Sequence, residues 1–417
     1  MSYITTLTRM WLTRTFKPFT FTNDYDYRLN FDDCENLGLY VHIPFCKKLC
    51  AFCPYCKEVY TYEKCDDYID YLIKEIHLVG SQMSEKKQVT SLYFGGGTPA
   101  LAAYRLYEII AAINEYFIIS EGIGLELHPD NVNKETLLVL KESGISKISI
   151  GIQSFQKKFL SVLGRKEVDF VQLSEVLKRT PFETVSMDFI FALPNQTIED
   201  LKADIEMAFS SGANHIAIYP FINFSFTDST VQVMGKKEKR VLLDEITRYC
   251  QTKRYIRDSI WTFSNSEHAK YSSMTRDNFL GFGCSATTLL INQFKVNTFS
   301  VEDYQKRIDG KELPTSLTTR FTKRQRMMYF LFWTSYSTKV NPDDFEKFFH
   351  VPLKKMYGFE FWIAQKLGFI IKENGIYFMT LKGAFYYHYY ENYYTLSYID
   401  QMWDVMRKEA FPDKISF

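Results

Sequence analysis

Four of the eight cysteines in this 417-residue chain lie close together, in the stretch CKKLCAFCPYC at 46–56, here named the cluster loop. Cys46, Cys50 and Cys53 form a C-x3-C-x2-C pattern, and Cys56 follows three residues later. Three thiolates can bind three irons of a [4Fe-4S] cluster and leave the fourth iron open to a small bidentate ligand. The spacing therefore indicates an iron–sulfur site, in which Cys56 is either a fourth ligand or a neighbour.

Zinc and disulfide bonds are the alternative uses of such cysteines. A structural zinc site needs four ligands, commonly two close pairs, but no second pair follows the cluster loop, and Cys250 and Cys284 are isolated in the sequence. Disulfide-stapled chains are usually short and cysteine-dense, whereas these cysteines are sparse outside the loop. We therefore expect a reducing, cytoplasmic location and favour the iron–sulfur interpretation.

A repeated pattern of strands and helices must position this loop. Between about residues 37 and 222, six β-rich runs alternate with amphipathic helical stretches such as Asp66–Met83. This alternation predicts an α/β fold, a partial (β/α)6 TIM-like barrel built around parallel strands. The predicted strands are Leu39–Ile43, Val89–Phe94, Ile123–Leu127, Ile148–Ile152, Val185–Phe191 and Ile216–Phe221.

The unusual residues follow the predicted strands. The cluster loop comes after the first strand, Gly95–Pro99 after the second, His128 after the third, Gln153–Phe155 after the fourth and Leu193–Thr197 after the fifth. Parallel barrels carry their active sites in the loops at the carboxyl ends of the strands. We therefore expect these loops to surround one cavity.

The rest of the chain suggests a division into three parts: an N-terminal arm at 1–36, the partial barrel at 37–310 and a C-terminal winged-helix-like module at 311–417. In this module, helical stretches precede Asn374-Gly375, a strong two-residue hairpin signal. A DNA-binding role is disfavoured because the formal net charge is only +1 and no basic face is concentrated. No apolar run is long enough to predict a membrane span.

Six motifs occur in a fixed order between about Leu39 and Tyr304, and the chain resembles the radical S-adenosylmethionine (SAM) superfamily in carrying them. Within it, the likeness is to the family of oxygen-independent coproporphyrinogen III oxidase and its relatives. The motifs are YVHIPFCKKLCAFC at 40–53, FGGGTP at 94–99, SIGIQSF at 149–155, LGR at 163–165, MDFIFALPNQT at 187–197 and NFLGFGCSAT at 278–287.

The resemblance assigns roles residue by residue. It implies that Cys46, Cys50 and Cys53 hold the [4Fe-4S] cluster, and it makes Cys56 a neighbour rather than a ligand. His42 is then expected to support the site rather than to bind a metal. Positions matching contacts of the cluster-bound SAM are Tyr40, Gly96, Glu126 and Thr287. Positions matching contacts of a second SAM are Phe52, Gly97, Thr98, Gln153, Arg165, Asp188 and Ile222.

The activity implied by the resemblance is reductive cleavage of SAM to a 5′-deoxyadenosyl radical, which abstracts hydrogen from a substrate. An electron donor such as flavodoxin or ferredoxin and a tetrapyrrole substrate are the implied partners, with conversion of coproporphyrinogen III to protoporphyrinogen IX as the leading hypothesis. A radical SAM methyltransferase, a haem-modifying enzyme and a haem chaperone without turnover stay open. The GFGCSAT stretch at 281–287 and the residues that precede the first strand favour an enzyme.

Three departures from the family pattern leave the substrate open. Tyr55 stands where the oxidase has a further cysteine, His128 stands where asparagine is usual, and HAKYSS at 268–273 follows its counterpart only loosely.

Overall fold

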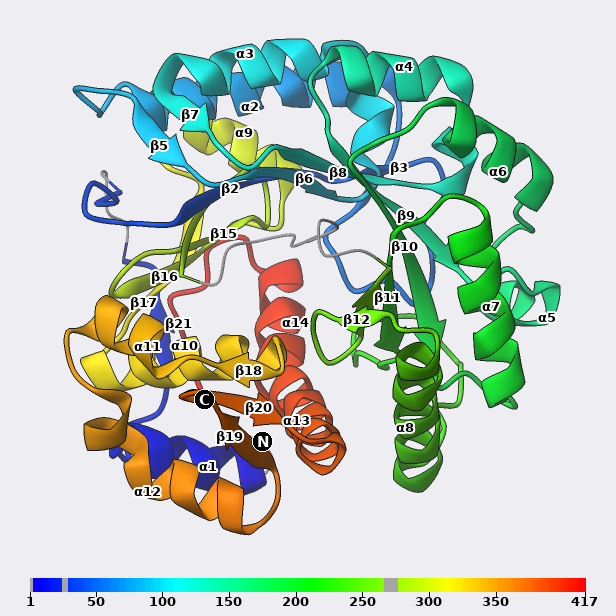
Figure 1. Ribbon diagram of the computed structural model, residues 1–417. Helices are drawn as coiled ribbons and strands as arrows, with labels where there is room; N and C mark the ends of the chain where they lie inside the picture. Colours follow the sequence, from blue (N-terminus) through cyan, green and yellow to red (C-terminus); the bar gives the residue numbers. More distant parts are fainter. Residues whose placement is uncertain (1–2, 25–28, 266–276) are drawn as a thin grey trace.

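The computed structural model describes residues 3–24, 29–265 and 277–417. Its main sheet has six parallel strands at the centre, each hydrogen-bonded to the next (Figure 1). These strands are β2 (Leu37–Ile43), β6 (Leu92–Gly96), β8 (Ile123–Leu127), β9 (Lys147–Gln153), β10 (Thr184–Phe191) and β11 (His215–Pro220). They coincide with the six predicted β-rich runs to within a few residues, so the expected α/β fold with an open run of parallel strands is confirmed.

Helices return the chain between consecutive strands and cover the outer face of the curved sheet (Figure 1). Their apolar faces are buried against the strands, as on α2, where Ile69, Leu72 and Ile76 are fully buried. The helices of this layer are α2 (Tyr62–Gly80), α3 (Leu106–Tyr116), α4 (Lys134–Glu142), α5 (Lys157–Val162), α6 (Phe170–Arg179), α7 (Ile198–Ser210) and α8 (Lys236–Thr252).

The sheet continues on both sides of these six strands. Next to β11 lie the antiparallel strands β13 (Thr262–Ser264) and β12 (Ile256–Arg257), and next to β2 lies β14 (Asn278–Phe282), which is parallel to it. Beyond β14 the order is β15 (Thr287–Leu289), β16 (Gln293–Asn297), β17 (Thr315–Arg320), β1 (Thr20–Thr22) and β21 (Lys414–Ser416). The two end segments of the chain therefore meet at this edge, where β1 pairs with both β17 and β21.

The C-terminal region is mainly helical and faces the inner side of the sheet (Figure 1). The predicted hairpin is present between β19 (Ile370–Glu373) and β20 (Ile376–Met379), and Asn374 and Gly375 have φ values of 48° and 87°. Such positive φ values suit the tight turn that joins two antiparallel strands. The other elements are α10 (Lys323–Tyr336), β18 (Lys339–Val340), α11 (Pro342–Phe349), α12 (Leu353–Lys366), α13 (Leu381–Tyr394) and α14 (Asp400–Lys408).

Two further helices pack against those already described. Helix α1 (Tyr3–Thr13) contacts α10 and α13, and α9 (Val301–Asp309) contacts α2. Within the described part of the chain, no helix is both long and apolar enough to cross a bilayer.

Candidate active site

A cavity of about 1560 Å³ lies between the carboxyl ends of the parallel strands and the C-terminal helices. It exceeds the about 300–1,000 Å³ of an ordinary small-molecule site. One wall is formed by the cluster loop and the loops after β6, β8 and β9, as the sequence predicted. The expectation is wrong for the loop after β10, because β10 contributes Asp188 and Ile190 from within the strand while Leu193–Thr197 is not among the lining residues. The opposite wall includes Tyr329, Trp333, Tyr336, Glu391 and Trp403 from the C-terminal region.

The conformation of the cluster loop is stabilised by contacts to its own backbone and to neighbouring loops. Short strands β3 (Phe45–Cys46) and β4 (Glu58–Val59) pair at its base, and the Lys57 ammonium donates hydrogen bonds to the carbonyl oxygens of Cys50 and Cys53, both at 2.6 Å. A hydroxyl and a guanidinium reach the thiols from outside the loop: Thr98 Oγ1 lies 3.6 Å from Cys46 Sγ, and Arg165 Nη1 lies 3.7 Å from Cys50 Sγ.

The three thiols suit an iron–sulfur cluster better than a single ion. Cys46, Cys50 and Cys53 are free, half-buried and line the same cavity. In the described residues they are not among the side chains whose ligand atoms lie within 4.8 Å of one another, the arrangement that a single ion requires. A cubane cluster needs wider spacing because each sulfur binds a different iron. The residues present therefore fit the predicted cluster.

The glycine loop after β6 lies directly against the cluster loop. The Gly97 amide donates to the Ile43 carbonyl and the Thr98 amide to the Phe45 carbonyl, both at 2.8 Å. A Cβ on Gly97 would lie 2.6 Å from the Phe45 carbonyl oxygen, and Gly96 has a φ of +119°, so neither position tolerates a side chain easily. Close approach of two backbones thus explains Gly97, and the positive φ explains Gly96, whatever ligand binds beside them.

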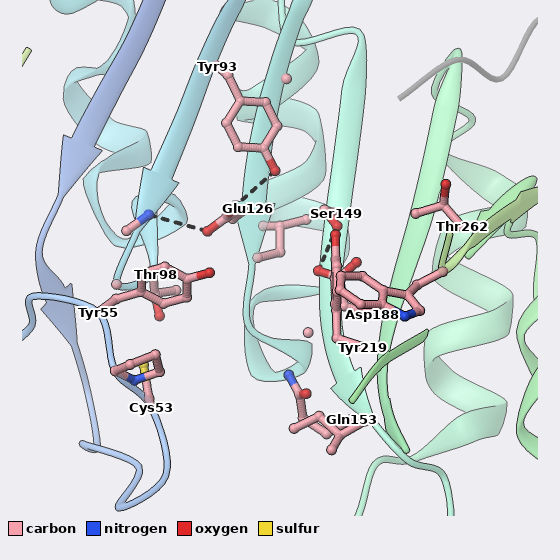
Figure 2. A pocket seen from close by; sticks show the side chains of 18 of the residues that line it. Cys53, Tyr55, Tyr93, Thr98, Glu126, Ser149, Gln153, Asp188, Tyr219 and Thr262 are labelled. Carbon is pink, nitrogen blue, oxygen red and sulfur yellow. Dashed lines mark hydrogen bonds between the residues drawn. The ribbon is translucent and has the colours of Figure 1, made fainter. Parts of the chain in front are cut away.

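Two carboxyl groups face the middle of the cavity (Figure 2). Glu126 accepts hydrogen bonds from the Tyr93 hydroxyl at 3.1 Å and from the Gly96 amide at 3.2 Å, and Asp188 accepts one from Ser149 at 2.9 Å. Burial, together with the charge of Asp188, raises the pKa of Glu126 to about 8. Burial raises the pKa of Asp188 to about 7, against the hydrogen bonds from its serine neighbours. Both groups are therefore partly protonated near neutral pH.

The structure brings together most of the residues that the family resemblance singled out. Gln153 has a φ of +69°, and Arg165 donates to the Gly151 carbonyl at 2.8 Å. Among the described lining residues, Tyr40 and Thr287 do not appear, although the Tyr40 ring stacks on Tyr93 with centroids 6.4 Å apart. Those that line the cavity are Cys46, Cys50, Phe52, Cys53, Gly96, Gly97, Thr98, Glu126, Gln153, Arg165, Asp188 and Ile222.

The departures from the family pattern have local explanations. His128 accepts a hydrogen bond from the Asp130 amide and caps a short helical turn, a task that an asparagine side chain performs equally well. Burial and the nearby Arg165 lower the pKa of His128 to about 4, so it is neutral at pH 7. Tyr55 lines the cavity, and its ring lies 5.9 Å from that of Trp403. The HAKYSS stretch lies outside the described residues.

Sequence reasoning missed several side chains of the cavity. Tyr93 and Ser149 hydrogen-bond the two central carboxyl groups, each from the strand next to that of its partner. Alternation along a strand gives the face on which a side chain lies but not its neighbour on the next strand, so the sequence did not single them out for this role. No sequence pattern indicated the aromatic wall, because Tyr329, Trp333 and Trp403 come from helices far along the chain from the predicted strands.

The fold and the residues of the site indicate a radical SAM protein, and the comparison with models of known protein families indicates the same class. The sequence model of the Radical SAM superfamily matches residues 40–208, from the first parallel strand to α7. The chain therefore contains a radical SAM domain, and this superfamily uses a [4Fe-4S] cluster and SAM.

More particular similarities point in two directions. The chain is 28% identical to "Heme chaperone HemW" of Lactococcus lactis over 76% of this chain and 86% of that protein. It is 27% identical to "Oxygen-independent coproporphyrinogen III oxidase" of Helicobacter pylori over 68% of this chain and 69% of that protein. The structure of coproporphyrinogen III oxidase (HemN) from Escherichia coli superposes with a TM-score of 0.73 at 19% identity, covering 95% of this chain and 98% of that one, which establishes the shared fold.

Proposed function

We propose that this protein is a radical SAM enzyme that oxidatively decarboxylates coproporphyrinogen III to protoporphyrinogen IX. Cys46, Cys50 and Cys53 would hold the cluster, which with SAM supplies a one-electron cleavage that provides the hydrogen-abstracting species. The observation that carries the proposal is the convergence of these thiols, the glycine loop and the two central carboxyl groups on one large cavity.

The side chains of the cavity have suitable chemistry for both ligands. Glu126 and Asp188 can accept hydrogen bonds or pair with the ammonium group of SAM, and Arg165 can pair with its carboxylate. A substrate with several carboxylates finds basic groups around the same cavity, including Lys47, Lys147, Lys166, Arg257 and Lys339. The large aromatic side chains of the opposite wall offer flat surfaces against which a macrocycle can pack.

A haem chaperone is the second candidate, because the Lactococcus lactis relative carries that name and aligns over 86% of its length. This hypothesis predicts stoichiometric haem binding without SAM cleavage. A methyltransferase on the same scaffold predicts S-adenosylhomocysteine beside 5′-deoxyadenosine.

The deciding experiment is anaerobic incubation of the reconstituted protein with SAM, dithionite and coproporphyrinogen III, followed by mass spectrometry. Formation of 5′-deoxyadenosine with loss of two carboxyl groups from the substrate is the expected result. SAM cleavage with an unchanged tetrapyrrole would overturn the substrate assignment, and haem binding without SAM cleavage would favour the chaperone. The control is Cys50→Ala, which removes a proposed cluster ligand and should give neither product.

A further inference from the structure

Three potential metal ligands lie together outside the cavity. His42 is at the end of β2, Cys56 is at the end of the cluster loop, and Cys284 is in the loop between β14 and β15. Their ligand atoms lie within 4.8 Å of one another, and all three side chains are buried, with exposed fractions of 3%, 6% and 0%. None of the three lines the cavity described above, so this group is a separate constellation.

We propose that His42, Cys56 and Cys284 bind a zinc ion that has no part in SAM cleavage. The two sulfurs are 4.0 Å apart. Zn–S bonds of about 2.3 Å at tetrahedral angles place two thiolates about 3.8 Å apart, so little movement is needed. The Ser285 hydroxyl lies 3.3 Å from His42 Nε2 and offers an oxygen as fourth ligand. Soft thiolates with imidazole favour zinc over calcium or magnesium.

The surroundings hold the two ligand-bearing segments in place. The Tyr68 hydroxyl donates to the His42 carbonyl and accepts from the Cys284 amide, both at 2.9 Å. The Gly283 amide donates to the buried Glu75 carboxylate at 2.7 Å. A Cβ on Gly283 would lie 2.6 Å from the His42 carbonyl oxygen, so glycine is needed for the loop to approach β2 this closely. The site is thus built by a rigid polar framework that orients its ligands.

The histidine is oriented by both ring nitrogens. Nδ1 lies 3.1 Å from the Tyr40 hydroxyl, and Nε2 lies 3.1 Å from the Cys56 carbonyl oxygen. Because a carbonyl oxygen only accepts, the bond to Cys56 places the ring proton on Nε2, with Nδ1 accepting from Tyr40. Zinc binding at Nε2 requires the other tautomer, in which Nδ1 donates to Tyr40, and breaks the bond to the Cys56 carbonyl. Zinc binding would then release the thiol protons and any proton on Nε2, as binding to such ligands generally does.

Charge balance also favours a bound divalent ion over two buried thiolates without a counter-ion. Two thiolates and Zn²⁺ sum to zero, and a neutral group is tolerated in a buried position where isolated charges are not. In the structure the Cys56 thiol instead donates to the Phe299 carbonyl at 3.2 Å. The ion would replace that bond and join the cluster loop to the β14–β15 loop.

The test uses the full-length protein with its iron–sulfur cluster assembled anaerobically, so that Cys46, Cys50 and Cys53 are occupied. Zinc and iron per chain are measured by mass spectrometry, and zinc coordination by X-ray absorption. We expect one zinc per chain with two sulfur ligands at about 2.3 Å and an imidazole nitrogen at about 2.0–2.1 Å. Zinc adventitiously bound at the cluster cysteines would instead give a sulfur shell without imidazole and would overturn the proposal.

Single substitutions distinguish loss of a zinc ligand from a general effect on folding. Cys56→Ala and Cys284→Ala should each weaken zinc retention by at least about tenfold, the range seen even for loss of a supporting partner. Cys250→Ala, at an equally buried cysteine on α8, should retain zinc. If the variants fail to fold, the wild-type absorption spectrum still decides. Absence of zinc at full iron occupancy, or a Cys56–Cys284 disulfide in peptide mass spectra, would overturn the proposal.

Discussion

At the scale of single residues, the middle of the cavity contains two carboxyl groups, those of Glu126 and Asp188. Burial disfavours the charged forms of both Glu126 and Asp188, and the charge of Asp188 further raises the pKa of Glu126. A cationic ligand between them would reverse the balance by stabilising their ionised forms. The two carboxyl groups therefore favour binding of a positively charged group between them.

The pH dependence of stability should reveal these carboxyls. Because the pKa of Glu126 is raised to about 8, its contribution to stability is present below its unfolded value of 4.5 and is lost as pH rises through 8. In Glu126→Gln, the fall in free energy of unfolding between pH 5 and pH 9 should be smaller by on the order of 1–2 kcal/mol, less than the full shift implies because the group faces a water-accessible cavity.

Urea unfolding of the ligand-free protein across this pH range measures the effect. Glu199→Gln, at an exposed position of α7, serves as the control and should keep the wild-type slope. An unchanged slope in Glu126→Gln would contradict the raised pKa.

The four cysteines of the cluster loop should respond differently when each is replaced singly by Ala. Cys46→Ala, Cys50→Ala and Cys53→Ala should each abolish both the visible absorbance of the cluster and SAM cleavage, because each removes the ligand of one iron. Cys56→Ala should retain the cluster, since Cys56 does not line the cavity and its thiol contacts Phe299 and Cys284 instead. Iron analysis and absorption spectra make the comparison, and cluster loss in Cys56→Ala would contradict the open-iron arrangement.

At the scale of elements, α7 holds the start of the loop that follows β9, directly after Gln153. The Asp204 carboxylate on α7 accepts hydrogen bonds from the Ser154 hydroxyl at 2.7 Å and from the Phe155 amide at 3.0 Å. Its side chain is 1% exposed. An outer-layer helix thus controls the backbone of a cavity loop without lining the cavity itself.

Asp204→Ala should lower the free energy of unfolding by about 2–3 kcal/mol, because it leaves buried donors without partners. Thermal or urea unfolding measures the change. Glu206→Ala is the matched control on the exposed face of the same helix, where its ion pair with Lys253 should contribute about 0–1 kcal/mol. Equal effects of the two substitutions would argue against a special role for Asp204.

At the scale of the whole molecule, α14 brings a distant part of the chain to the cavity and to the cluster loop. The α14 residue Trp403 lies 5.9 Å from the ring of Tyr55 in the cluster loop and stacks on Phe224 with centroids 6.2 Å apart. Arg407, on the same helix, donates to the Pro54 carbonyl. These contacts connect the C-terminal helix to the cluster loop and to the segment after β11, so the helix packs against the loop that carries the thiols.

Removing the Trp403 side chain should expose the cluster. Trp403→Ala should keep the assembled cluster under anaerobic conditions but lose it several-fold faster in air, because water and oxygen reach the thiols more easily. The decay of the visible absorbance after exposure to air measures the rate. Trp362→Ala on α12, whose side chain is 54% exposed, should decay like the wild type, and equal rates in both variants would exclude shielding by Trp403.

The sequence by itself determined the six parallel strands, the loops that follow them and the cysteine pattern. These features depend on local periodicity and on short spacings, which a single stretch such as the cluster loop carries in full. The hairpin at Asn374-Gly375 was predictable for the same reason, because the residue types dictate the turn.

Only the tertiary structure decided which distant residues meet. The aromatic wall with Trp403, the pairing of β1 with β21 and the approach of Cys284 to Cys56 join segments far apart in the chain. Cys284 looked isolated in the sequence, and His42 was expected only to support the cluster site. Their proximity arises because β14 pairs beside β2, and such long-range pairing is set by packing of the whole sheet rather than by local sequence.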